Sequence, residues 1–168
     1  MHYGLVLAQS LGRYDDGVTL LDKALALDPN LAAAWTFRGM FKGGQGKVDE
    51  AMSDLKQALR LSPRDPGGWV AEHGLAWANL MAGRHDEAAS WATKALQARP
   101  GVGYTLRVLI AAHALAGRHD KAREALATYL ANEPQARLST IRESYLRRVT
   151  IPAFNILADG LRRAGFPE

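Results

Sequence analysis

A glycine and a proline recur at matched intervals along this chain, and this regularity restricts its fold more than any other feature. The glycines are Gly12, Gly46, Gly83 and Gly117, and the prolines are Pro29, Pro63, Pro100 and Pro134. Both series advance by 34, 37 and 34 residues. Each glycine is followed by an apolar stretch of helical periodicity that ends at the next proline. Two independent markers with one period indicate a structural unit that is repeated four times.

The second unit shows why these residue types stand where they do. Gly39 and Ala51 are small enough for two helices to cross closely, and Gly46 suits the turn between them. Pro63 ends the second helix because proline cannot donate to the helical hydrogen-bond ladder. In units two to four, the second helix carries a carboxylate in its first turn, at Asp49, Asp86 and Asp120. The partial positive charge at the start of a helix stabilises a carboxylate there. Each unit is therefore predicted to be a pair of antiparallel helices.

The same unit carries a recognisable family pattern. Its characteristic positions are Trp35, Gly39, Gly46, Ala51, Leu55, Ala58 and Pro63. This pattern resembles the tetratricopeptide repeat, and the resemblance implies an all-α fold, an α-solenoid of four helix-turn-helix units. The units are expected at about residues 1–31, 32–65, 66–102 and 103–136, with 1–134 as the repeat region and the first unit truncated.

The pattern predicts where the helices of this solenoid begin and end. Helix pairs are expected over residues 1–11 and 14–27, 32–43 and 48–61, 67–82 and 85–98, and 103–116 and 119–132. The spacing of 37 in the third unit places three extra residues between Trp69 and Gly83. Three residues are close to one helical turn, so a longer first helix is expected in that unit.

Residues 135–168 leave the repeat pattern but keep helical periodicity, and they are expected to form a pair of capping helices. Thr150 and Pro152 mark the start of the last helix, and Gly165 marks its end. Residues 145–148 and 159–168 are similar to the ends of bacterial adenylate/guanylate-cyclase-like and winged-helix regulatory proteins that carry such repeats. That likeness implies that this chain is the C-terminal regulatory or scaffolding part of a larger signalling protein.

The first unit begins inside its own first helix, with Met1 near the position of Trp35 in the second unit. Two interpretations follow. Either the chain is a fragment of a larger protein, or the uncapped N-terminal face pairs with another molecule, such as a second copy of the chain.

Several kinds of chemistry lack support in the sequence. The chain has no cysteine, and no histidine cluster has the three or four ligands that zinc needs. His85 and His119 occupy equivalent repeat positions, so their likeness reflects the repeat. The segment 43–47 resembles a phosphate-binding loop, but Phe41 and Val48 stand where glycine and Ser or Thr are required. No catalytic motif is present, so we expect no enzyme, no cofactor and no metal.

Charge and hydropathy restrict the kinds of partner and the cellular location expected for this chain. The net charge is +4, and residues 135–168 carry 6 Lys or Arg against 3 Asp or Glu. The pairs Arg147-Arg148 and Arg162-Arg163 are too few for a basic stripe, so nucleic acid is not expected. No apolar stretch approaches the ~20 residues that cross a bilayer. Residues 1–6 lack the basic segment and the small-residue cleavage site of a secretory signal, so none is expected. A cytoplasmic location is expected.

The resemblance implies a concave groove lined by the first helix of each unit. Residues one position beyond the packing positions should face it at i, i+4 and i+7. This rule selects Thr36, Met40 and Gly43 in unit two, His73, Trp77 and Leu80 in unit three, and Arg107, Ala111 and Ala114 in unit four. Trp77 is the best anchor for a partner, although the irregular third unit leaves burial in the core as an equal alternative.

Two cations, Arg38 and Lys42, stand at positions that are usually apolar. They either bind an anionic partner or lay their stems over the core, and the second interpretation is favoured. Met40, Trp77 and Ala111 stand where family members with a carboxylate clamp carry asparagine, so that mode is not expected. The sequence predicts a module that binds a partner protein or peptide through apolar contacts, with Arg107 and His73 giving polarity.

Overall fold

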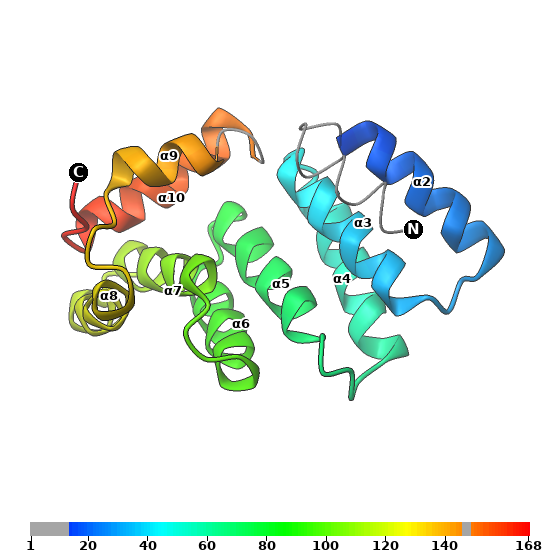
Figure 1. Ribbon diagram of the computed structural model, residues 1–168, viewed down its shortest axis with the longest axis horizontal. Helices are drawn as coiled ribbons and strands as arrows, with labels where there is room; N and C mark the ends of the chain where they lie inside the picture. The colour runs from blue at the N-terminus through cyan, green and yellow to red at the C-terminus, as the bar shows by residue number, and fades with distance from the viewer. Residues whose placement is uncertain (1–13, 146–148) are drawn as a thin grey trace.

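The structure is a computed structural model that describes residues 14–145 and 149–168. All its regular elements within these ranges are helices (Figure 1). They are α2 (Tyr14–Leu27), α3 (Ala32–Gly44), α4 (Val48–Leu61), α5 (Trp69–Met81), α6 (His85–Ala98), α7 (Gly103–Leu115), α8 (His119–Asn132), α9 (Leu138–Tyr145) and α10 (Ile151–Arg163). The helix expected over residues 1–11, and with it the N-terminal face proposed for self-association, lies outside the described residues.

Consecutive helices pair as the repeat predicts. α3 packs on α4, α5 on α6 and α7 on α8, and each pair also packs on the next through α4 with α5 and α6 with α7. The first helices α3, α5 and α7 contact one another in turn and form one layer (Figure 1). This is the arrangement of an α-solenoid, and it confirms the predicted fold class.

Glycine has the two predicted roles in this stack. A Cβ on Gly39 would lie 2.7 Å from Leu55 Cγ and 3.0 Å from the Ala51 carbonyl oxygen, so only glycine permits this helix crossing. Gly46 ends the turn between α3 and α4 with φ +81°, in the left-handed region that favours glycine.

The longer first helix expected in unit three is wrong. α5 has 13 residues, the same length as α3 and α7. The extra residues lie instead in the linker between α4 and α5, which contains Pro63 and Pro66. Proline cannot continue a helix, and the Asp65 carboxylate accepts a hydrogen bond of 2.8 Å from the Gly67 N–H, which holds a turn there.

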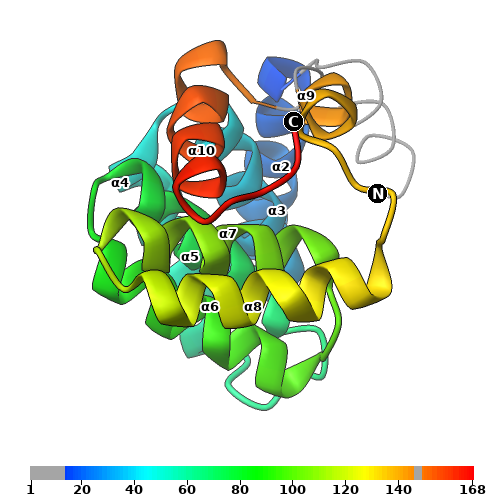
Figure 2. The same cartoon turned by 90° about the vertical axis from the view of Figure 1, so that its left-hand side faces the viewer.

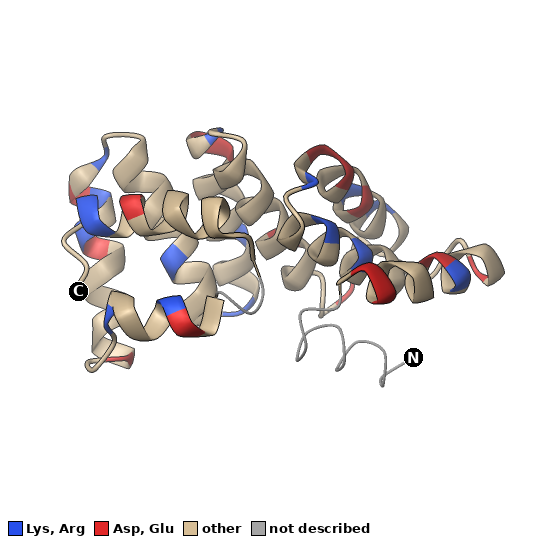
Figure 3. Cartoon of the chain, turned by 90° about the horizontal axis from the view of Figure 1, so that it is seen from above, with Lys and Arg blue, Asp and Glu red and all other residues tan. Residues whose placement is uncertain are grey.

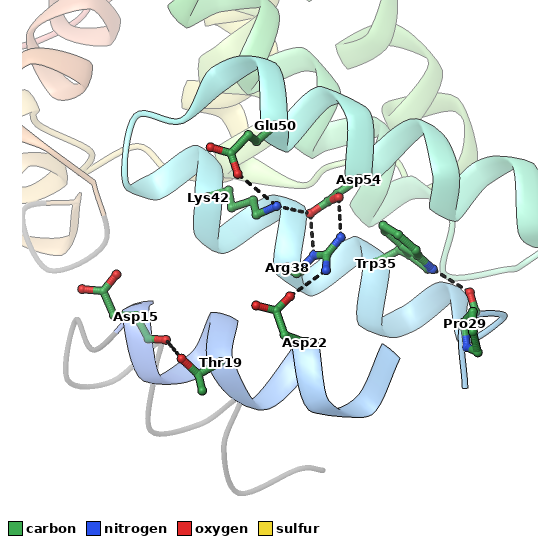
Figure 4. Close-up of polar contacts among 9 residues, drawn as sticks. All are labelled: Asp15, Thr19, Asp22, Pro29, Trp35, Arg38, Lys42, Glu50 and Asp54. Atoms are coloured by element: carbon green, nitrogen blue, oxygen red, sulfur yellow. Dashed lines mark hydrogen bonds and ion pairs between the residues drawn. The ribbon is translucent and has the colours of Figure 1, made fainter. Parts of the chain in front are cut away.

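Arg38 and Lys42 form ion pairs with carboxylates inside the fold (Figure 4). Arg38 donates from Nε and Nη2 to the two carboxylate oxygens of Asp54, at 2.7 and 2.8 Å, and from Nη1 to Asp22 at 2.6 Å. Lys42 Nζ lies 3.1 Å from Asp54 and 3.2 Å from Glu50. These ion pairs join α2, α3 and α4. Both cations therefore have a structural role, as favoured, but they fill it through ion pairs that the sequence did not predict.

The last helix begins and ends at the predicted residues. The Thr150 side chain accepts a hydrogen bond from the Ala153 N–H at the start of α10, and Pro152 lies in its first turn. Gly165 follows the helix with φ +85°. The two signals in the sequence therefore mark α10 correctly.

Only part of this C-terminal segment covers the end of the stack. Phe166 lies against Tyr129 of α8, with ring centroids 5.5 Å apart. α10 itself packs on α7 and also contacts α5, and Figure 2 shows it running across the direction of α7. A Cβ on Gly160 would lie 2.6 Å from Ala111 Cβ, so the two helices touch at this point. α10 thus lies over the first-helix layer of units three and four.

Candidate functional site

The described residues enclose a groove of about 380 Å³ on the layer of first helices. Its walls come from α3, α5 and α7, with α9 and Val149 on the facing side and Tyr14 at one edge. The lining residues are Phe37, Gly39, Met40, Phe41, Gly43 and Gly44 of α3, Val70, His73, Gly74 and Trp77 of α5, Tyr104 and Arg107 of α7, and Ser144 and Tyr145 of α9. The groove is therefore mainly apolar and aromatic.

Four of the seven residues predicted for the site come together here. Met40, His73, Trp77 and Arg107 all line the groove, and so does Gly43. Thr36 does not line it, and its hydroxyl donates a hydrogen bond of 3.2 Å to the Ala32 carbonyl oxygen in its own helix. The helix face predicted from the repeat therefore lines the groove along the middle part of the three first helices, α3, α5 and α7.

Leu80 and Ala111 are not brought to the groove, because both are completely buried. Leu80 stands at the repeat position of Gly43, where a Cβ would lie 3.7 Å from Ala51 Cβ of the paired helix. A leucine in that place enters the core, and Leu80 shares the core with Ala88, the counterpart of Ala51. Ala111 is covered by α10 at Gly160. Ala114, at 1% exposure, is buried as well.

Trp77 belongs to both the groove and the core. Its side chain is only 8% exposed and is part of the hydrophobic core of α5 to α10, yet it also lines the groove. Its ring lies 5.9 Å from that of Tyr145. The sequence left open whether Trp77 lies in the groove or in the core, and the structure shows that it belongs to both. Truncating Trp77 would disturb the packing as well as the groove.

Sequence reasoning missed several lining residues. Phe37, Val70 and Tyr104 each lie three residues before a predicted one, so the same face extended by one turn toward the N-terminus would have found them. Tyr145 and Ser144 come from α9, which stands outside the repeat. No periodic signal in the sequence places α9 beside the groove.

His73 is buried in the groove wall and electrically neutral. Its Nδ1 lies 3.2 Å from Thr105 Oγ1, and its ring meets that of Tyr104 edge-on at 4.6 Å. Burial, and secondly the positive charge of Arg107, lower the pKa of His73 to about 3. At neutral pH His73 therefore contributes a polar contact without a charge.

Arg107 is the one charged side chain among the described residues that line the groove. Its Nη1 donates a hydrogen bond of 3.1 Å to Tyr129 Oη. Its guanidinium carbon lies 5.2 Å from the ring centroid of Tyr145 and 5.7 Å from that of Tyr129. The cation is thus held between two aromatic rings at the α7 end of the groove.

The described part of the chain contains no group of three or more His, Cys, Asp or Glu residues that could hold a metal ion. Within the same part, every helix is too short or too polar to cross a bilayer. Basic and acidic residues are interspersed over the described helices (Figure 3). What the groove offers chemically is an aromatic and apolar surface with one buried cation.

Comparison with known protein families assigns the chain to one of them. Two sequence models, both described as tetratricopeptide repeat, match residues 30–101 and 79–144 and together span most of the solenoid. This chain belongs to the tetratricopeptide repeat family. Membership of this family and the shared fold support a protein-interaction module.

Solved structures of other proteins share the fold. PilW, described as a widely conserved type IV pilus biogenesis factor, is 19% identical with a TM-score of 0.73, covering 98% of this chain and 76% of PilW. A thermophilic tetratricopeptide protein from Thermus thermophilus, TTC0263, is 25% identical, with a TM-score of 0.67 and coverage of 98% and 89%. YrrB, described as having an unusual peptide-binding site, is 17% identical, with a TM-score of 0.64 and coverage of 96% and 83%.

A search of curated proteins finds no match to the sequence. The tetratricopeptide matches end at residue 144. The likeness of the C-terminal segment to cyclase-like or winged-helix regulatory proteins receives no support from these comparisons, so the family assignment rests on the repeats alone.

Proposed function

We propose that the groove on α3, α5 and α7 binds a peptide segment of a partner protein. The observation that carries this proposal is the lining itself: aromatic and apolar side chains from three consecutive units face one hollow of about 380 Å³. Pockets of this size and composition are typical of binding sites, and buried aromatic anchors supply most of the affinity in such interfaces.

The contacts of the lining residues suggest a division of roles. Tyr104 is 36% exposed and presents part of its ring to a ligand, whereas Trp77 at 8% forms the floor. Met40 adds an adaptable thioether from α3. Arg107 and the neutral His73 supply polarity at the α7 end. The solved structure of YrrB, a tetratricopeptide protein described as having a peptide-binding site, supports this type of ligand.

Selection from a displayed library of random peptides, each roughly ten residues long, tests the proposal. Peptides selected on the wild-type chain should bind the Tyr104→Ala variant at least about tenfold more weakly, because the variant removes an exposed aromatic contact. Fluorescence anisotropy of a labelled peptide measures the difference. Tyr104 is the suitable residue because its partial exposure separates binding from packing better than Trp77 does.

Leu27→Ala provides the matched control. Leu27 is 88% exposed on α2 and does not line the groove, so this variant should bind the selected peptides as the wild type does. Circular dichroism should show equal helicity for all three proteins. Equal affinity of the wild type and the Tyr104→Ala variant would show that the peptides bind elsewhere, and the groove assignment would then be wrong.

A further inference from the structure

Arg107 lacks a counterion within the described part of the chain. No Asp or Glu there forms an ion pair with it, and its Nε is buried without any hydrogen-bond acceptor. Arg38 and Lys42, the cations of α3, are by contrast paired with carboxylates. A partly buried charge without an opposite charge is costly, so a ligand carboxylate that reaches the guanidinium would remove part of that cost.

The tyrosine beside Arg107 does not neutralise it. Tyr129 Oη accepts from Arg107 and donates to Glu133 Oε2 at 2.8 Å. Burial, followed by the hydrogen bond to Glu133, raises the pKa of Tyr129 to about 12. The phenol is therefore neutral at physiological pH, and the carboxylate of Glu133 remains one side chain away from the guanidinium. The groove keeps a net positive charge at its α7 end.

Resting on the function proposed above, we propose that Arg107 selects partner segments in which one Asp or Glu side chain lies among apolar residues. A carboxylate matches the single guanidinium in charge, and hydrogen bonds between ionised partners are roughly twice as strong as neutral ones. Trp77, Tyr104 and Tyr145 line the same groove with aromatic surface, and the lower local dielectric of such surroundings strengthens an ion pair. The apolar neighbours of the acid would occupy the part of the groove on α3 and α5.

The carboxylate is assigned to an internal side chain because the groove lacks the features that bind other anions. Chain termini are typically held by free backbone N–H groups, and phosphates by arginine clusters. Most of the described walls come from helix interiors, whose backbone N–H groups are bonded within the helix, and the lining presents one cation. From Arg107 the lining extends to α5 and α3 and, on the facing side, to Tyr145 and Val149, which leaves room for apolar residues beside the acid.

A library of peptides tests this inference. Each peptide is blocked at both ends, by N-terminal acetylation and C-terminal amidation, and each position is varied in turn. We expect wild-type protein to select Asp or Glu at one position flanked by apolar residues. For the best peptide, replacing that acid by its isosteric amide should weaken binding by about tenfold or more, since a buried charged hydrogen bond is lost. The Arg107→Gln variant should bind the acid and amide peptides with nearly equal affinity.

Each other outcome overturns the inference in a distinguishable way. Selection of apolar peptides without an acidic position, or equal affinity for acid and amide peptides, would refute the role of Arg107 and leave the proposed function standing. A preference that arises only in a parallel library with free C-termini would assign the cation to a chain terminus instead. If neither library yields a peptide that binds, the proposed function fails and this inference fails with it.

Two variants control for charge and folding. Arg123→Gln removes the same charge from an exposed site on α8, where Arg123 pairs with Asp120, and it should retain the acidic preference. Arg107→Lys keeps the charge but loses the planar fork, so it should show an intermediate preference. The comparison of acid and amide peptides on the wild-type protein needs no variant, so the inference can be tested even if Arg107→Gln does not fold.

Discussion

Arg38 and Arg107 both lie on first helices, and their surroundings give them different roles. Arg38 reaches two carboxylates, of which Asp54 has a side chain only 5% exposed, and it links three helices. Arg107 reaches only tyrosines among the described residues. Removing an acid from the first arrangement leaves a buried charge unpaired and destabilises the fold. In the second arrangement, a ligand can supply the acid.

His73 gives a prediction at the same scale. Its lowered pKa means that the unfolded chain binds a proton near pH 6.5 while the folded chain does not until about pH 3. Between these values the unfolded state holds more protons, so stability is complete above the unfolded pKa and is lost as the pH falls. From about pH 7.5 to about pH 5.0, His73 should reduce the free energy of unfolding by about 2 kcal/mol.

Urea unfolding of the wild type and of His73→Gln over this pH range measures the effect. Glutamine does not titrate and can still bond to Thr105, so the variant should lose about 2 kcal/mol less than the wild type on acidification. His113 also has a pKa lowered mainly by burial, but it is present in both proteins and cancels in the difference. Parallel pH dependence of the two proteins would show that His73 is not buried in its neutral form.

At the level of the helices, the contact of α10 with α7 depends on Gly160. A Cβ there would lie 2.6 Å from Ala111 Cβ and 2.9 Å from the Ala111 carbonyl oxygen, and backbone atoms cannot move aside cheaply. Gly160→Ala should therefore destabilise the chain by about 1–3 kcal/mol, although alanine favours a helix over glycine. Thermal unfolding followed by circular dichroism measures the change.

Gly43→Ala is the matched comparison in α3. Its Cβ would meet Ala51 Cβ at 3.7 Å and Trp77 Cδ1 at 3.8 Å, which are ordinary van der Waals contacts. This variant should be stabilised by up to about 1 kcal/mol through helix propensity. The same sign of change in both variants would contradict the close packing of α10 on α7.

The boundaries of the described helices could largely be predicted from the sequence, and the exceptions have a physical cause. The glycine and proline markers act locally, so α4, α6 and α8 begin and end where the pattern indicates. The spacing of 37 residues shows that three residues are added but not where they go. The chain places them in the linker at Pro63 and Pro66, because prolines disfavour a longer helix.

At the scale of the whole molecule, the repeat transfers one helix face from unit to unit. This explains why Met40, Trp77 and Arg107 could be predicted as neighbours although they lie on three helices. The C-terminal segment has no counterpart in the repeat, so no periodic signal predicts that α9 lines the groove or that α10 covers Ala111. The site was predictable where the period holds, and unpredictable where a non-repeated segment packs on it.

The position of α10 over the first-helix layer can be tested by comparing equivalent positions of two units. Met40 and Ala111 have the same place in the repeat, but Met40 is partly exposed in the open groove and Ala111 is fully buried beneath α10. Ala111→Gln adds volume and a buried amide, so it should cost more than about 3 kcal/mol of unfolding free energy. Met40→Gln keeps the length of the side chain and should cost about 1 kcal/mol. If α10 capped only the end of the stack, both positions would face the groove, and chemical denaturation would give similar costs for the two variants.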